Sequence, residues 1–142
     1  MSTKVLLVDD EEEFVDVLSQ RLEARGFAVN TAFNGDEAIA AIEEHDVDVV
    51  ILDVQMPGRN GIDTLQEIKR LRPITEVIML TGHGTVETAI QGMKLGAYDY
   101  LMKPTNTEEL VDKINRGHQR KKDQEDRIRQ AEVDRLVKTR GW

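Results

Sequence analysis

The chain has 142 residues, the size of one ordinary domain with a single hydrophobic core. Its formal net charge of −8 argues against non-specific binding to nucleic acid or to an anionic membrane, and the absence of cysteine excludes disulfides and thiolate chemistry. The sequence shows no signal peptide and no apolar segment long enough to span a membrane, so we expect a cytoplasmic protein with no membrane partner and no direct contact with nucleic acid.

Five short apolar segments alternate with five segments whose apolar residues recur at helical spacing. The expected strands are residues 5–9, 27–33, 48–53, 77–80 and 98–102. The apolar positions of the expected helices fall within residues 14–22, 38–42, 62–71, 86–93 and 110–114. Because strands and helices alternate at this spacing, the sequence predicts a doubly wound α/β fold, in which helices cover both faces of a five-stranded parallel sheet.

Acidic residues follow the first and the third expected strand. Residues 49–52 are four consecutive apolar residues, typical of a central strand buried on both faces, and Asp53 comes directly after them. Asp9 and Asp10 follow the first strand in the same way. Because the carboxyl ends of parallel strands meet at one edge of the sheet, where ligands bind in this fold class, we expect the three carboxylates to lie close together. A glycine-rich phosphate-binding loop would have to stand where these acids are, so nucleotide binding is not expected.

The chemistry of this edge is that of a cation and an oxyanion. Clustered carboxylates cannot all stay ionised without a compensating charge, and Mg²⁺ is the natural partner because it prefers oxygen ligands. Thr81 and Lys103 end the fourth and fifth strands, and a metal, an ammonium and a hydroxyl together suit a tetrahedral oxyanion that a carboxylate receives covalently. The simpler interpretations are a helix cap for Thr81, a solvated Lys103, and acids at residues 11–13 that complement a helix dipole.

Several spaced motifs occur in a fixed order along the chain. They are Asp9-Asp10, Asp53, Met56-Pro57-Gly58, Gly61, Thr81, Gly96-Ala97, Tyr100 and Lys103-Pro104. Over residues 4 to about 116 this set resembles the receiver domain of bacterial two-component response regulators. The resemblance implies a flavodoxin-like sheet with strand order 2-1-3-4-5. Within the family, residues 81–84 and 97–100 are most similar to receivers of nitrogen-regulatory, enhancer-binding activators.

The resemblance implies roles for the acids. Asp53 matches the phosphoacceptor, which receives a phosphoryl group from the phosphohistidine of a histidine kinase or of a phosphotransfer protein. Asp9, Asp10 and the backbone carbonyl of Gln55 match the groups that hold Mg²⁺ together with Asp53. Such a protein is not an enzyme in the usual sense, although it promotes its own phosphorylation and dephosphorylation.

Three further positions match residues that respond to the phosphoryl group. Thr81 matches the hydroxyl that turns toward the phosphoryl oxygens, Tyr100 the aromatic residue that moves inward with it, and Lys103 the ammonium that pairs with the phosphoryl group. The peptide bond between Lys103 and Pro104 is cis in this family. By sequence alone, a tyrosine on a strand is more often an ordinary packing residue, but the spacing of Tyr100 from Lys103 favours the switching role.

Three functions remain open at this point. The first is a response regulator whose protein-binding face changes when Asp53 is phosphorylated, with a downstream protein target and a second copy of the chain as candidate partners. The second is the receiver portion of a transcriptional activator whose output domain is absent. The third is a Mg²⁺-dependent aspartyl-phosphate phosphatase, which is least favoured because Gln55 stands where such an enzyme would need a second acid.

The chain continues beyond the receiver motifs with a different charge balance. Residues 1–116 carry 22 acidic and 11 basic side chains, a net charge of −11, whereas residues 117–142 carry 5 acidic and 8 basic ones, a net charge of +3. We expect the last receiver helix to end near Arg116-Gly117, because glycine commonly terminates helices. The receiver domain would then be residues 1–117, and residues 118–142 a charged helical tail or linker, marginally stable and separable from it.

Overall fold

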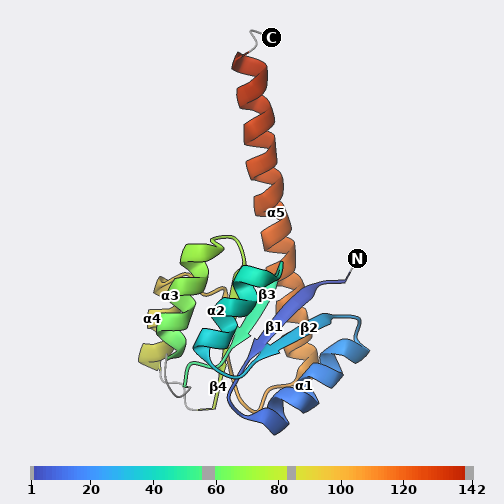
Figure 1. The fold of residues 1–142 in the computed structure, drawn as a ribbon, viewed down its shortest axis with the longest axis vertical. Coiled ribbons are helices and arrows are strands. Elements are labelled where there is room, and N and C mark those ends of the chain that lie inside the picture. The colour runs from blue at the N-terminus through green and yellow to red at the C-terminus, as the bar shows by residue number, and fades with distance from the viewer. Residues whose placement is uncertain (1, 56–59, 83–85, 140–142) are drawn as a thin grey trace.

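The computed structural model describes residues 2–55, 60–82 and 86–139 of the chain (Figure 1). The strands are β1 (Lys4–Val8), β2 (Ala28–Ala32), β3 (Val49–Leu52), β4 (Glu76–Thr81) and β5 (Asp99–Met102). The helices are α1 (Glu12–Ala24), α2 (Gly35–Glu44), α3 (Gly61–Leu71), α4 (Val86–Lys94) and α5 (Thr107–Thr139). All strand pairs are parallel and the order is β2-β1-β3-β4-β5, so the predicted fold is confirmed.

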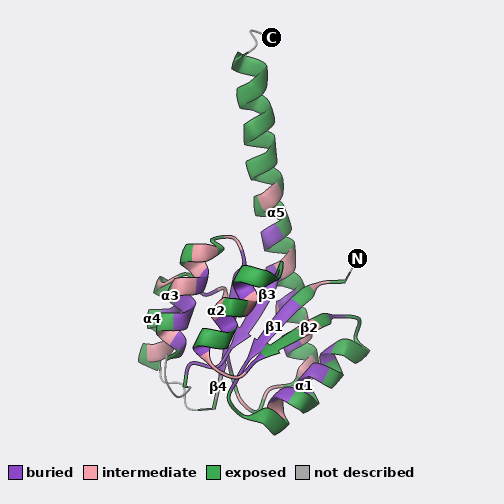
Figure 2. Cartoon of the chain, in the orientation of Figure 1, coloured by how far each residue is buried: buried purple, intermediate pink, exposed green. Residues whose placement is uncertain are grey.

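The apolar residues of the sheet alternate between two core clusters, one on each face. In β3, Val50 and Leu52 belong to the cluster that packs against α2 and α3, whereas Val49 and Ile51 belong to the one that packs against α1 and the first turns of α5. All four are buried, which makes β3 a central strand covered on both faces (Figure 2). Each such side chain contributes about 1.5 to 3 kcal/mol by leaving water, so the sequence holds this strand and both its ends firmly in place.

The last helix is much longer than the sequence predicted. α5 contains 33 residues, which corresponds to about 50 Å of helix, and its distal part projects from the body (Figure 1). The expected end near Arg116-Gly117 is wrong, because the helix continues without a break through Gly117. Gly117 is buried against the sheet, where an added Cβ would lie 3.5 Å from Cβ of Glu76 and 3.6 Å from Cγ2 of Val49. Packing on the sheet and contacts of the next turn therefore offset the cost of about 1 kcal/mol for glycine inside a helix.

The beginning of the expected tail is part of this packed region. Lys121 is buried, with 8% of its side chain exposed, and its ammonium lies 3.1 Å from a carboxylate oxygen of Asp48. Residues 126–139 are exposed, as the uniformly green distal helix in Figure 2 shows. The division of the chain at residue 117 stays a prediction, but the first turn after it contacts the α/β body through His118, Arg120 and Lys121. None of the helices in the described ranges combines the length and apolar character needed to cross a membrane.

Candidate functional site at the carboxyl edge of the sheet

The three predicted acids meet where β1 and β3 end. Val8 is in register with Leu52, so the residues that follow these two strands, Asp9 and Asp53, are level at the sheet edge. The backbone N–H of Asp53 donates to the carbonyl of Val8 at 2.9 Å, which continues the pairing one residue past β3. Carboxylate oxygens of Asp9, Asp10 and Asp53 all lie within 4.8 Å of one another. The sequence prediction that these carboxylates form a cluster is confirmed.

The cluster concentrates negative charge in a partly dry site. Asp9 is 2% exposed and Asp53 is 5% exposed, while Asp10 faces solvent. Burial raises the pKa of Asp53 above its ordinary value, and the charges of Asp9 and Asp10 raise it further. A hydrogen bond from the backbone N–H of Gln55 (3.0 Å) and the charge of Lys103 act in the opposite direction but do not compensate. The site therefore favours an additional cation.

Lys103 supplies the cation that the sequence predicted, and it lies closest to Asp9. Its Nζ is 2.6 Å from Oδ2 of Asp9, 3.3 Å from Oε1 of Glu11 and 3.8 Å from Oδ2 of Asp53. Burial acts to lower the pKa of Lys103, but the hydrogen bond to Asp9 and the charges of these three acids together raise it. The ammonium also lies 4.2 Å from the centre of the Phe14 ring, a favourable cation–π distance. Lys103 is thus held as a charged group beside the carboxylates.

Glu11 and Phe14 were not predicted as site residues. The sequence assigned Glu11 to the dipole of a helix N-terminus and Phe14 to the apolar face of the first helix, and both assignments describe a real part of their environment. What the sequence could not reveal is that Lys103, about ninety residues later, reaches both side chains. The available signal was their position within the first turn after the acidic pair, on the element that borders the site.

The donor set suits a hard divalent cation. Asp9, Asp10 and Asp53 offer only carboxylate oxygens, which Mg²⁺ prefers, and their mutual repulsion would be relieved by a bound cation. The predicted contribution of the Gln55 carbonyl remains a prediction, since the contact described for this residue is through its backbone N–H. The predicted turn at Met56–Gly58 lies outside the described residues.

The remaining predicted residues surround this site on β4 and β5. Thr81 is the last residue of β4 and pairs in register with Met102. A Cβ added at Gly82, the next residue, would lie 3.9 Å from Cδ of Lys103, so the end of β4 lies beside the aliphatic part of this side chain. The Lys103-Pro104 bond is cis, as the resemblance implied. The side chain of Thr81 is not among the described ones, and its role stays a prediction.

Tyr100 lies on β5 and is partly buried against the core cluster below α2 and α3. Its hydroxyl lies 2.9 Å from the sulfur of Met102, at the protein surface. This placement leaves the ring against the core and its hydroxyl at the surface, the usual environment of a tyrosine side chain. The predicted switching role of Tyr100 is therefore compatible with its surroundings and stays a prediction.

Comparisons with known proteins agree with this geometry. Residues 5–115 match the sequence model of the response regulator receiver domain. The transcriptional regulatory protein CpxR of Klebsiella pneumoniae is 46% identical over 111 residues, which cover 78% of this chain and 47% of CpxR. An NtrX-like response regulator of Rickettsia bellii is 40% identical over 115 residues, which cover 80% of this chain and 24% of that protein.

A solved structure of a receiver domain has the same fold as this chain. The crystal structure of a CheY-like receiver domain protein from Methanospirillum hungatei superposes with a TM-score of 0.84 at 30% identity, covering 87% of this chain and 99% of that one. The chain spans about half or less of the length of the two regulators above. Members of this family are phosphorylated on an aspartate in two-component signalling and generally bind Mg²⁺ through acidic residues. The chain belongs to the response regulator receiver domain family.

Proposed function

We propose that Asp53 is the phosphoacceptor of this receiver, and that it takes a phosphoryl group from the phosphohistidine of a histidine kinase or a phosphotransfer protein. The observation that carries the proposal is the different hydrogen bonding of the two carboxylate oxygens of Asp53. Oδ1 of Asp53 accepts the N–H of Gln55, whereas Oδ2 is 3.8 Å from Lys103, too far for a hydrogen bond. Oδ2 can therefore act as a nucleophile toward phosphorus.

The other two acids are less suited to that role. Asp9 is fully engaged, because Oδ1 accepts the backbone N–H of Glu11 at 2.9 Å and Oδ2 pairs with Lys103 at 2.6 Å. Asp10 is exposed to solvent, which weakens the electrostatic effects on its carboxylate. Asp53 combines burial with an oxygen that accepts no hydrogen bond from the residues that the structure describes, and this combination distinguishes it from its neighbours.

Mg²⁺ held by Asp9, Asp10 and Asp53, with the Gln55 carbonyl as a further ligand, would supply positive charge that offsets repulsion between the carboxylates and an incoming phosphoryl group. In the transfer, a bond forms between Oδ2 of Asp53 and phosphorus, and the phosphorus–nitrogen bond of the phosphohistidine breaks with its electron pair leaving on the imidazole. Lys103, already charged beside Asp53, pairs with a phosphoryl oxygen. The hydroxyl of Thr81, at the end of β4, donates a hydrogen bond to another phosphoryl oxygen.

The output of such a receiver is a change in what its surface binds. We propose that phosphorylation of Asp53 repositions Thr81 and Tyr100 and thereby alters the affinity for a downstream protein in the cytoplasm. The chain itself acts as a phosphoacceptor that assists its own phosphorylation and dephosphorylation. Similarity to CpxR, a transcriptional regulatory protein, favours a second candidate in which the chain is the receiver portion of a transcriptional regulator.

The direct test is labelling with a small phosphodonor. Intact-mass spectrometry after incubation with acetyl phosphate should show one added phosphoryl group when Mg²⁺ is present and none in a chelator. Asp53→Asn should abolish the adduct, and Asp16→Asn, at an exposed acid on α1, should leave it unchanged. Phosphorylation that persists in Asp53→Asn, or that does not need a divalent cation, would overturn the assignment.

A further inference from the structure

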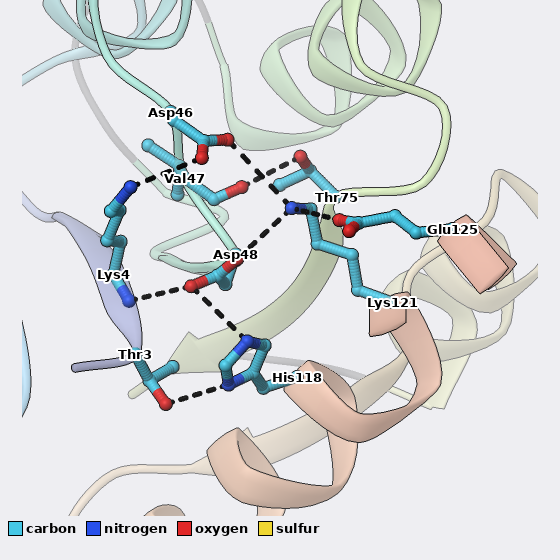
Figure 3. A network of polar contacts seen from close by, with 9 residues as sticks. All are labelled: Thr3, Lys4, Asp46, Val47, Asp48, Thr75, His118, Lys121 and Glu125. Carbon is cyan, nitrogen blue, oxygen red and sulfur yellow. Dashed lines mark hydrogen bonds and ion pairs between the residues drawn. The ribbon is translucent and has the colours of Figure 1, made fainter. Parts of the chain in front are cut away.

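A second group of charged residues lies at the amino-terminal edge of the sheet, where α5 leaves the receiver body. The centre of this group is Lys121, which follows the part of the chain that matches the family, residues 5–115. Its ammonium lies 2.7 Å from Oε1 of Glu125, 3.1 Å from Oδ1 of Asp48 and 3.9 Å from Oδ1 of Asp46 (Figure 3). With 8% of its side chain exposed and three acidic neighbours, Lys121 forms buried ion pairs that hold α5 in place, unlike a solvated surface charge.

Asp48 connects this lysine to two other elements. Its Oδ2 accepts the backbone N–H of Lys4, at the start of β1, at 2.8 Å. The same oxygen lies 3.5 Å from Nε2 of His118, whose Nδ1 lies 2.8 Å from the hydroxyl of Thr3. Figure 3 shows the side chains of His118 and Lys121 from α5, and the backbone N–H of Lys4 from the N-terminal strand, converging on Asp48. One buried carboxylate thus ties the helix to the beginnings of both β1 and β3.

Arg120 holds α5 on the other side of Gly117 from Lys121 and His118. Nε of Arg120 lies 3.3 Å from Oε2 of Glu76, the first residue of β4, and its guanidinium lies 5.6 Å from the centre of the Tyr98 ring. Glu76 is buried and also lies 3.4 Å from Nζ of Lys69 on α3. Between the contacts of Lys121 and those of Arg120, the backbone of Gly117 faces the sheet. Contacts on both sides of a helix resist its rotation as well as its tilting.

We propose that these residues clamp α5, so that residues 118–139 move as a rigid arm of the receiver body and not as a flexible tail. Lys121 is the main positioning residue, and Asp48, His118, Glu125, Arg120 and Glu76 complete the clamp. The clamp lies at the opposite edge of the sheet from Asp53 and does not rest on the proposed phosphorylation. Residue 117 is therefore not a flexible boundary between the receiver body and α5.

A rigid arm has a mechanical consequence. From Lys121 to Thr139 the helix rises by about 27 Å, so a tilt of about 10° at the clamp would displace Thr139 by about 5 Å. A flexible tail would average such a tilt away. The clamp thus makes the position of the exposed distal helix, which carries Ile128, Val133, Leu136 and Val137 on its surface, depend on the orientation of the receiver body.

The arm can be tested by measuring distances between spin labels. The chain has no cysteine, so Gln20→Cys on α1 and Glu132→Cys on the arm, both at exposed positions, can be labelled selectively. Double electron–electron resonance should give one narrow distance distribution. Lys121→Met, which keeps the length of the side chain and removes its charge, should make the distribution about twice as broad, because the helix frays or swings where its fastening is lost. Lys122→Met, at the exposed neighbouring lysine, should leave it unchanged.

Two further measurements make the outcome decisive. Amide hydrogens of residues 118–125 should exchange at least about tenfold faster in Lys121→Met than in Lys122→Met. If Lys121→Met does not fold, the double variant Asp48→Asn/Lys121→Met removes both charges of the buried pair, leaves only the half-exposed Glu125 without its lysine, and should still broaden the distribution. A broad distribution in the unmodified receiver would overturn the proposal. A narrow, unshifted distribution in a folded Lys121 variant would do so equally.

Discussion

The two ends of β3 each carry a buried aspartate with a lysine in reach, yet their electrostatic states are opposite. Asp48, before the strand, is 8% exposed, and Asp53, after it, is 5% exposed. The pKa of Asp48 lies below its ordinary value, whereas that of Asp53 lies above it. Burial alone therefore does not decide the ionisation of these groups.

The partners decide it. At Asp48, burial acts to raise the pKa, but the N–H of Lys4, the ammonium of Lys121 and the charge of His118 outweigh it. At Asp53, burial raises the pKa and the charges of Asp9 and Asp10 raise it further. Lys103 does not compensate, because its ammonium lies 2.6 Å from Asp9 but 3.8 Å from Asp53. A compensated carboxylate stabilises the fold, whereas an uncompensated one is available for a cation and a phosphoryl group.

Removal of the compensated carboxylate should have the largest effect on stability. Asp48→Ala leaves Lys121 without its buried partner and should lower the free energy of unfolding by about 3 kcal/mol. The folded-state pKa of Asp48 is depressed, so its contribution is present above its ordinary value near 3.8 and is lost as the pH falls through the folded-state pKa. Urea denaturation at pH 7 measures the effect, and a loss below about 0.5 kcal/mol, the range of ordinary surface substitutions, would break the comparison.

Metal affinity should depend on the acids and not on the lysine of the uncompensated end. Asp10→Ala should weaken Mg²⁺ binding at least about tenfold, or about 1.4 kcal/mol, because it removes a carboxylate ligand. Lys103→Ala should bind Mg²⁺ no more weakly than the unmodified chain, since it removes a competing cation from Asp9. The same variant should accept a phosphoryl group poorly and lose any conformational response to it. Calorimetric titration would contradict this division if both variants lost affinity equally.

Neutralising the uncompensated carboxylate should stabilise the fold, the reverse of the effect at Asp48. Without Mg²⁺ at pH 7, Asp53→Asn should raise the free energy of unfolding by about 1 kcal/mol, because it removes a charge that the folded state disfavours. The raised folded-state pKa means that the contribution of Asp53 is present below the ordinary value near 3.8 and is lost as the pH rises through the folded-state pKa. Thermal melts in chelator provide the measurement, and destabilisation by Asp53→Asn would refute the charge argument.

The smallest effect concerns the aromatic face beside Lys103. Phe14→Leu keeps most of the apolar contact of α1 but removes a cation–π interaction of about 0.5 to 1 kcal/mol, so phosphorylation by acetyl phosphate should slow about threefold. Phe14→Tyr should restore the rate, since it keeps the ring. Val17→Leu, at an exposed position of the same helix, serves as the control. Equal rates in Phe14→Leu and the control would show that the ring does not position the ammonium.

The sequence could predict one end of β3 much better than the other. Asp9, Asp53 and Lys103 each follow an apolar strand, and the geometry of parallel sheets brings such positions to one edge. Asp48 also borders a strand, but it lies at the edge where this rule assigns no function. Its partner Lys121 is 73 residues away, in a segment whose charges resemble those of a solvated helix. Nothing in local spacing pairs these two residues.

The end of α5 was mispredicted for a related reason. Glycine is a sound local signal for a helix stop, but at Gly117 tertiary contacts override it. The contacts come from Glu76 and Val49 in the sheet and from the charged residues of the following turns. Local propensity was readable from the sequence, whereas the surface that receives the helix exists only once the sheet has formed.

The most direct measurement of the central claim is a carboxyl ¹³C NMR titration of the metal-free chain, with the Asp48 and Asp53 signals assigned from their Asn variants. The opposite environments of the two ends of β3 predict that Asp48 titrates below the ordinary aspartate pKa of about 3.8 and Asp53 above it. Added Mg²⁺ should lower the apparent pKa of Asp53 and leave that of Asp48 unchanged. Coincident titration of the two carboxylates, or a reversed order, would contradict the account.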